Sequence, residues 1–438
     1  MQTTLEKTDD IRTCKAAIQP DSGAKNEYQK IFKTIDGLSD YVIDLQRNMT
    51  CRPAISPETG GKGEYQKAQY LESEIKKLKF DEYIRIDVPD ARAEKGIRPN
   101  LVVKYHGIDK TKTLWLLAHT DTVPEGDLSL WKTNPFEMVL DKDGDTIYGR
   151  GVEDNQQAIT AALVAARAIM ESGKRPPVNL GIIMLADEEL GSFLYGIKYI
   201  VDNHRDLFGK DDSFIVQDSG DPEGKKLEIA EKNVTWHKFT TIGAQAHASL
   251  PSEGNNAFVA GSALAVRLHE ALPAKFNKKD TLFNYPFSSF EPTKKEANVP
   301  NVNTIPGSDI FYMDSRVLPC YDPKDVEAEI AKIVKSVEDE YKVKIKTELV
   351  IKLSSKATSA DAPIVKRYAE AVEKVNGVKA ELIGIGGSTF AAAIRNLGLS
   401  AVVAATTYEV PHTPNEKSSI KFTLSDAKII SYILMHMK

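Results

Sequence analysis

Cysteine is scarce in this sequence, and the cysteines that occur are scattered. The 438 residues contain three, Cys14, Cys51 and Cys320, with no short spacing between them. An odd, scattered set argues against a disulfide framework and against a thiolate metal site. Residues 1–15 lack the apolar core of a signal peptide, and no apolar run approaches the roughly 18 residues that span a bilayer. We therefore expect a cytoplasmic protein.

A strong excess of charge of one sign is also missing. Lysine and arginine number 57 and aspartate and glutamate 62, which gives a net charge of −5. No basic block stands out, so the charge pattern gives no support for nucleic-acid binding. The composition, with 42% hydrophobic and 27% charged residues, is typical of a globular protein. The length predicts about two or three domains.

Short apolar runs and helical patterns alternate in the first half of the chain. Strands are predicted at residues 101–105, 114–118, 178–186 and 212–218, and helices at 64–78, 156–173 and 193–204. This alternation predicts an α/β fold, with a parallel or mixed sheet that helices cover on both faces. Ligands of such sheets bind beyond the carboxyl ends of the strands.

The pattern changes near Ala230 and returns after residues 354–363, where a further strand is predicted at residues 400–406. The intervening sequence predicts a smaller α+β module, with strands at 236–243, 309–318 and 342–352, helices at 255–272 and 323–341, and a looser polar stretch that reaches Asn303. We therefore predict an inserted domain within a catalytic domain. The predicted ranges are 1–30 for a polar N-terminal extension, 31–230 and 354–438 for the catalytic domain, and 231–353 for the insertion.

Acids and histidines stand where the predicted strands of the catalytic domain end. They are His119, Asp121, Asp154, Asp187, Glu188, Glu189, Asp218 and His412. Each alone has an ordinary explanation, such as a helix cap or a solvated turn. Together they would bring several carboxylates to one edge of a sheet, where their repulsion is costly unless cations lie between them. The sequence therefore predicts a metal cluster at this edge.

The types of ligand narrow the choice of metal. Imidazoles and carboxylates without cysteine suit Zn²⁺, Mn²⁺ or Co²⁺ in a catalytic site. A bridging carboxylate permits two ions about 3.5–4 Å apart. His119 and Asp121 are two residues apart, which places both on one side of a strand. Asp121 is thus placed to hydrogen-bond the ring nitrogen that His119 does not give to the metal.

Five ordered motifs carry a resemblance to a known family. They are AHTDTVP (118–124), GRGVEDNQQ (149–157), ADEELGS (186–192), VQDSG (216–220) and VPHTPNE (410–416). Together they resemble the M20 family of metallopeptidases and deacylases, and most closely its succinyl-diaminopimelate desuccinylase and acetylornithine deacetylase branch. The resemblance implies a zinc-peptidase-like catalytic domain with a mixed sheet covered by helices. It also implies that the inserted α+β domain is a lid through which the protein forms a homodimer.

The resemblance further implies a role for each candidate ligand. His119 and Asp218 would hold one divalent ion, and Glu189 and His412 would hold the other. Asp154 would bridge the two ions, and the peptide bond that follows it is expected to be cis. Zinc is the expected metal, with cobalt and manganese as alternatives.

Other residues would act around the ions. Glu188 would be the general base for a metal-activated water, and Asp121 would orient His119. In the inserted domain, His247 would stabilise the oxyanion in the partner subunit's site, although taken alone it reads as a surface histidine. Asn303 and Arg316 would contact the substrate, and Arg316 could equally belong to a surface ion pair.

The Gly-rich stretch at residues 381–394 would hold the acid end of the substrate. The resemblance assigns this contact to Gly386, Gly387, Ser388 and Thr389. As a nucleotide site the stretch fails, because both the G-K-[ST] and the G-x-G-x-x-G orders are absent.

These patterns predict a two-metal amidohydrolase that cleaves an N-acyl amino acid bearing a free carboxylate. Phe390 and Ala391 stand where many desuccinylases carry an aspartate, which limits how far substrate specificity can be carried over. A metallo-carboxypeptidase or dipeptidase acting on small peptides is the alternative enzyme. A non-catalytic metal-binding relative is the alternative from another class, although it would not need Glu188.

Overall fold

The contacts of the chain divide it into two units. The computed structural model describes residues 22–191 and 193–437. The first unit ends at Ile229 and resumes over Thr358–Ile383 and again from Thr389. The second unit comprises Ala230–Ala357 and Gly384–Ser388.

Helix α1 (Ser22–Asp36) begins within the stretch predicted as a polar extension. Its residue Tyr28 is buried, and the ring lies edge-on to that of Tyr432 with centroids 5.2 Å apart. Ile31 and Ile35 of the same helix are also buried. The helix therefore belongs to the core of the first unit. The earlier part of the predicted extension, residues 1–21, lies outside the described residues.

An eight-stranded mixed sheet runs through the first unit in the order β1-β2-β6-β3-β7-β16-β8-β15. In chain order its strands are β1 (Glu82–Pro89), β2 (Ile97–Tyr105), β3 (Asp109–His119), β6 (Val178–Leu185), β7 (Ser213–Asp221), β8 (Lys226–Glu231), β15 (Glu381–Ile385) and β16 (Ser400–Thr406). The neighbours β6, β3, β7 and β16 are parallel. Every residue of β6 is buried, as expected of a parallel strand covered on both faces. The mixed sheet predicted from the sequence is confirmed.

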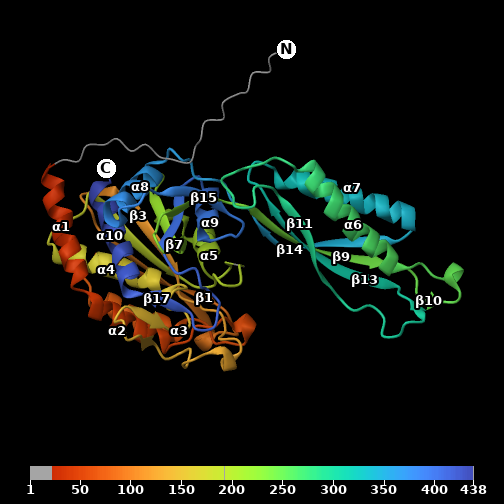
Figure 1. The fold of residues 1–438 in the computed structure, drawn as a ribbon, viewed down its shortest axis with the longest axis horizontal. Helices are drawn as coiled ribbons and strands as arrows, with labels where there is room; N and C mark the ends of the chain where they lie inside the picture. Colours follow the sequence, from red (N-terminus) through yellow and green to blue (C-terminus); the bar gives the residue numbers. More distant parts are fainter. Residues whose placement is uncertain (1–21, 192, 438) are drawn as a thin grey trace, which may run out of the picture. The chain divides into compact units, whose positions relative to one another are not determined.

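Helices cover this sheet, with α4 and α10 on one side and α5 and α9 on the other (Figure 1). The helices of the first unit after α1 are α2 (Ser39–Thr50), α3 (Tyr65–Ile75), α4 (Gln156–Glu171), α5 (Ile197–Asn203), α8 (Pro363–Asn376), α9 (Phe390–Asn396) and α10 (Ile420–His436). Alanine favours the helical state and occupies little volume, so the Ala-rich α4 packs closely against β3, α2 and α10. A small sheet adds β4 (Val139–Leu140), β5 (Thr146–Tyr148) and β17 (Lys417–Ser419).

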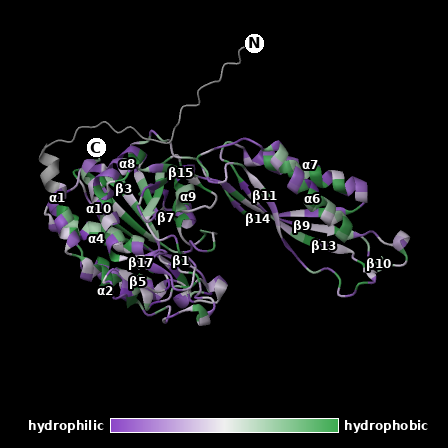
Figure 2. Cartoon of the chain, viewed as in Figure 1, coloured by the Kyte–Doolittle hydropathy of each residue, from purple (hydrophilic) through white to green (hydrophobic). Residues whose placement is uncertain are grey.

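The second unit has its own sheet and its own core. The sheet order is β11-β13-β9-β14, and each pairing is antiparallel. Its elements are β9 (Asn233–Ile242), β10 (Ala246–His247), α6 (Ala257–Lys275), β11 (Ser289–Lys295), β12 (Thr304–Ile305), β13 (Ser308–Val317), α7 (Pro323–Tyr341) and β14 (Lys344–Leu353). Apolar residues of α6, α7 and the sheet form one cluster that includes Phe239, Leu264 and Ile330. Figure 2 shows apolar and polar residues alternating along α6 and α7, as expected of helices with one buried face.

Two predicted segments differ from the structure. The stretch before Asn303, predicted to be loose, contains the edge strand β11, which carries a register shift between Pro292 and Lys294. Most of β11 is exposed and lacks apolar alternation, so the period-2 signal was absent. The helix predicted over 193–204 is confined to α5, which begins at Ile197. By contrast, α7 and β16 begin and end where predicted.

Among the described residues, no helix is long and apolar enough to cross a membrane. The cytoplasmic location stays a prediction.

Gly181 of β6 tests how tightly the central strands pack. A Cβ built on Gly181 would lie 2.1 Å from the Trp115 ring, and that ring is buried with its Nε1 donating to Asp212 at 2.8 Å. We expect Gly181→Ala to lower the free energy of unfolding in urea by about 1–3 kcal/mol through overpacking. The control Gly37→Ala meets nothing closer than 3.4 Å and should change stability by less than about 0.5 kcal/mol. Equal stability of the two variants would contradict this packing.

Candidate metal centre

The candidate ligands come from neighbouring strands and two loops of the first unit. His119 is the last residue of β3, and Glu189 follows the end of β6. Asp218 lies near the end of β7. Asp154 precedes α4, and His412 follows β16. Because β6, β3 and β7 are parallel neighbours, their carboxyl ends meet at one edge of the sheet, where ligands of such folds bind.

Asp154 lies between the two imidazoles. Its Oδ1 is 2.8 Å from Nε2 of His119, and its Oδ2 is 3.3 Å from Nε2 of His412. The same nitrogen of His119 lies 3.3 Å from Oδ1 of Asp218, and that of His412 lies 2.8 Å from Oε2 of Glu189. Each imidazole thus faces one oxygen of Asp154 and one further carboxylate.

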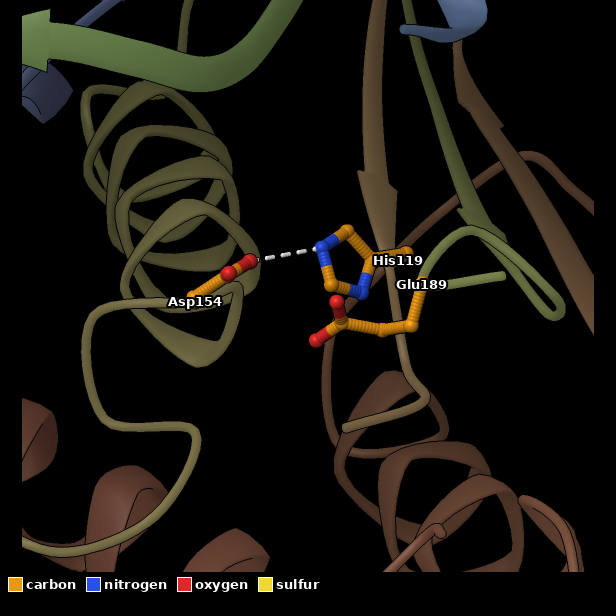
Figure 3. A group of neighbouring side chains, drawn as sticks. All are labelled: His119, Asp154 and Glu189. Carbon is orange, nitrogen blue, oxygen red and sulfur yellow. Dashed lines mark hydrogen bonds and ion pairs between the residues drawn. The ribbon is translucent and has the colours of Figure 1, made fainter. Parts of the chain in front are cut away.

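Ligand atoms of His119, Asp154 and Glu189 lie within 4.8 Å of one another. Figure 3 shows the three side chains converging from a strand end, a helix start and a turn. The group therefore offers three ligand atoms to a single divalent cation. Imidazole nitrogens and carboxylate oxygens without a thiolate also form a donor set that suits Zn²⁺, Co²⁺ or Mn²⁺.

The pKa values of the site residues also indicate that positive charge is favoured among the carboxylates. Hydrogen bonds with Asp154 and Glu189 raise the pKa of His412 to about 10. Burial, together with the nearby Asp154 carboxylate, raises the pKa of Glu189 to about 7. Burial lowers the pKa of His119, but its carboxylate partners raise it more, so that this pKa lies well above the usual value. Positive charge near these carboxylates therefore stabilises them, and divalent ions would supply that charge.

Asp121 supports the site from behind. Nδ1 of His119 lies 3.1 Å from the main-chain oxygen of Asp121 and 3.4 Å from its carboxylate. The carboxylate accepts hydrogen bonds from the main-chain N–H groups of Glu188, at 3.0 Å, and Glu189, at 3.1 Å. One side chain therefore positions both the end of β3 and the turn that follows β6.

Glu188 lies beside the ligand cluster and is partly buried. Burial raises its pKa well above the usual value, and the carboxylates of Asp218 and Glu189 add to this effect. The turn that carries Glu188 begins at Asp187, whose φ is 61°. Asp187 contacts the buried Arg98 guanidinium, with Nη1 3.2 Å from Oδ1. Sequence reasoning missed Arg98 because nothing in the local sequence signals a partner 89 residues away in the chain.

The other predicted site residues lie mostly in the second unit. His247 is exposed on β10, its Nδ1 2.7 Å from Oγ of Ser249, and β10 pairs with β12 beside Asn303. Arg316 donates from Nε and Nη2 to Asp314, at 2.7 and 2.9 Å.

Arg316 also reaches the Gly-rich loop, because its Nη1 donates to the main-chain oxygen of Gly386 at 2.9 Å. Arg316 thus uses three of the five N–H groups of its guanidinium in these contacts. Gly387 and Ser388 belong to the same unit, and Oγ of Ser388 is buried without a partner. Thr389 belongs to the first unit and caps α9 by accepting from Ala391 N.

Phe390, one of the two residues at which the sequence departs from the family pattern, packs beside His119. The side chain is buried and packs edge-on to the imidazole of His119, with ring centroids 6.5 Å apart, and to Phe193, at 5.4 Å. An apolar wall thus stands beside His119. The peptide bond Asp154–Asn155 is cis, which confirms that expectation.

The sequence profile of Peptidase family M20/M25/M40 matches residues 115–436. The chain belongs to this family. A protein of Methanocaldococcus jannaschii named as an uncharacterized metallohydrolase is 38% identical, over 84% of this chain and 90% of that protein. A succinyl-diaminopimelate desuccinylase of Xanthomonas oryzae is 27% identical over 50% of this chain and 57% of that enzyme. A tripeptidase from Staphylococcus aureus has a similar fold, with a TM-score of 0.72 and 18% identity over 91% of this chain and 98% of that one.

This M20 protein is a metal-dependent hydrolase that acts on amide or peptide bonds. Family membership implies divalent metal ions, and the cluster around Asp154 offers a site for them. The fold class predicted from the sequence is confirmed.

Ion binding should stabilise the folded protein measurably. Removing ions with a chelator leaves the carboxylate cluster uncompensated, so the melting temperature should fall. Restoring Zn²⁺, Co²⁺ or Mn²⁺ to about 100 times its Kd should return about 2.7 kcal/mol. Asp154→Asn keeps the volume of the side chain between the two imidazoles but not its charge, and should abolish the response. A melting temperature that no divalent ion changes would contradict a metal centre here.

Proposed function

We propose that this M20 hydrolase binds two divalent ions and cleaves the amide bond of an N-acyl amino acid or short peptide. Zinc is the proposed metal, with cobalt or manganese as alternatives. One observation carries the proposal, namely that Asp154 directs one carboxylate oxygen toward each imidazole. We assign His119 and Asp218 to one ion, Glu189 and His412 to the other, and Asp154 to both. When bound, the ions would polarise the scissile carbonyl and lower the pKa of the attacking water.

Glu188 is the proposed general base. Its partly buried carboxylate lies beside the ligands without being assigned to either ion, and its raised pKa favours taking up a proton. In the proposed step, Glu188 accepts the proton of the water that attacks the carbonyl carbon. It then gives that proton to the nitrogen as the C–N bond breaks, which yields a carboxylic acid and an amine. Transfer of the remaining acid proton to the amine leaves a carboxylate and an ammonium group. Asp121 holds the main-chain N–H of Glu188 and so orients this base.

The size of the adjacent cavity supports a small substrate. It measures about 210 Å³ and is lined by Asp154, Asn155, Gln217, Asp218 and Thr407. For the acid end of the substrate we propose Arg316 with Gly386, Gly387, Ser388 and Thr389. The remaining N–H groups of Arg316 suit a carboxylate.

The resemblance to desuccinylases favours a deacylase, and 27% identity to the Xanthomonas oryzae enzyme agrees with it. Phe390 argues against assigning the desuccinylases' specificity for a succinyl group to this protein, because an apolar ring lies beside His119. Peptidase activity on small peptides is the second candidate, because a family profile named for peptidases spans most of the chain. Turnover of N-acetyl and N-succinyl amino acids, compared with di- and tripeptides after chelation and metal restoration, decides between them. Hydrolysis of none of these substrates by the metal-loaded protein would contradict the proposal.

The second unit is the proposed homodimer contact. Helix α6 exposes Phe258, Val259 and Val266, with 45%, 48% and 55% of each side chain accessible. A second copy of this chain would cover these residues. We further propose that His247 and Asn303 stabilise the oxyanion in the partner's site.

Glu188→Gln should abolish turnover while keeping both ions. The amide cannot accept the proton of the water, so kcat should fall by about 10²- to 10⁴-fold. Metal content measured by mass spectrometry should stay at the wild-type level. Glu171→Gln, at the far end of α4 in an exposed ion pair with Arg167, is the control and should retain full activity. Loss of metal together with turnover in Glu188→Gln would make Glu188 a ligand instead.

Val266→Glu should separate the proposed dimer. A charge at this apolar position opposes burial against a second copy, so light scattering should report the monomer mass. The control Ile108→Glu places a charge on an exposed residue of the first unit and should leave the dimer intact. His247→Ala should lower kcat without changing the measured mass. A wild-type protein that is monomeric at micromolar concentration would refute the dimer.

A further inference from the structure

A buried carboxylate from the loop after His412 holds the loop that carries Asp154. Glu416 is fully buried, and its Oε1 accepts hydrogen bonds from the main-chain N–H groups of Glu153, at 2.9 Å, and Asp154, at 3.1 Å. Its Oε2 accepts from Gly151 N at 3.0 Å and from Nη1 of the buried Arg150 at 2.7 Å. Four donors, one of them the cationic Arg150 guanidinium, thus compensate the burial of this carboxylate.

A second carboxylate makes the same kind of contact in the opposite direction. Glu153 precedes the bridging Asp154, and only 5% of its side chain is exposed. Its Oε2 accepts from Tyr408 N at 2.7 Å, and its Oε1 accepts from Val410 N at 2.8 Å. These two N–H groups belong to the loop that carries His412. Each loop therefore sends one glutamate to the main chain of the other, and we call this pair the Glu153–Glu416 clamp.

The loop held by Glu153 has a backbone that needs external support. Glu409, His412 and Asn415 have φ values of 60°, 61° and 60°. Residues other than glycine adopt this left-handed region rarely, and they stay there only when the surrounding structure fixes them. The hydrogen bonds from Tyr408 and Val410 to Glu153 come just before His412 and supply such a constraint.

We propose that Glu153 and Glu416 are positioning residues that set the placement of Asp154 relative to His412 before any metal binds. The inference rests on the proposed function in taking His412 as a ligand. The remaining ligands have other supports, because His119 ends β3 and Asp218 lies within β7. Loss of Glu153 should therefore affect the ion that uses His412 and leave the other ion in place.

Metal titration of Glu153→Gln tests this selectivity. The substitution keeps the shape of the side chain but replaces one acceptor oxygen with an NH₂ group that faces an N–H donor. In parallel, His412→Ala identifies which of the two ions uses His412. Glu153→Gln should lower the affinity for that ion by about 10- to 100-fold, the range typical of lost ligand-supporting contacts. The affinity for the other ion should not change.

Asp212→Asn is the matched control. Asp212 is another buried carboxylate of the first unit that accepts main-chain N–H groups, from Thr113 at 2.8 Å and Gly209 at 2.9 Å. It does not contact either ligand loop, so this variant should lose stability without selective loss of an ion. If Glu153→Gln keeps the wild-type affinity for both ions, or lowers both affinities equally, the proposed positioning role of the clamp is refuted. If His412→Ala itself keeps both ions, the ligand assignment under the proposed function is what fails.

Hydrogen exchange of the wild-type protein provides a test that does not depend on folding of the variants. In the metal-free protein, the amides of Tyr408 and Val410 should exchange much more slowly than those of an unstructured peptide. The clamp exists before metal binding only if these amides are protected. Exchange at the unstructured rate in metal-free protein, followed by protection on adding Zn²⁺, would show that the metal orders the loop and would overturn the proposal.

Discussion

Repulsion among carboxylates gathered at one edge of a sheet is the constraint on which the catalytic unit depends. Asp154, Asp218 and Glu189 meet around two imidazoles, with Glu188 beside them. At such short separations in a partly buried site, unshielded negative charges would oppose folding. In the metal-free protein the two imidazoles, whose pKa values are raised, supply part of the compensation, and bound divalent ions would replace their protons and supply more positive charge. The same repulsion that makes the site costly to form would favour the binding of cations.

Main-chain N–H groups hydrogen-bond the buried carboxylates that are not assigned as metal ligands. The carboxylates of Asp121, Glu153 and Glu416 each accept from at least two main-chain donors. Through these bonds each buried charge also fixes a segment that carries a ligand or the proposed base. Compensation of charge and placement of ligands are thus achieved by the same contacts. The packed β3 and β6 strands, with Trp115 against Gly181, give these turns a rigid base.

The sequence predicted the order of elements well, because the signals are local. The apolar runs of β6 and β16 and the capped α7 are visible within a few residues of chain, and their bounds were close to those observed. β11 was missed, since a mostly exposed edge strand with a proline lacks the alternation that marks a strand. The sequence left two interpretations for Arg316, and the structure shows this half-buried side chain hydrogen-bonded to Asp314 and Gly386.

By itself the sequence determined the fold class, the family and the identity of the residues available as ligands. Short motifs at strand ends are contiguous in the chain, so they can be recognised without coordinates. Only the tertiary structure decided which acid faces which imidazole, and that each oxygen of Asp154 faces a different one. It alone paired Glu153 with the loop at Tyr408 and Glu416 with the loop at Asp154, and it alone buried Arg98 against Asp187. These contacts join segments far apart in the chain, and a hydrogen bond between them depends on packing that no local pattern records.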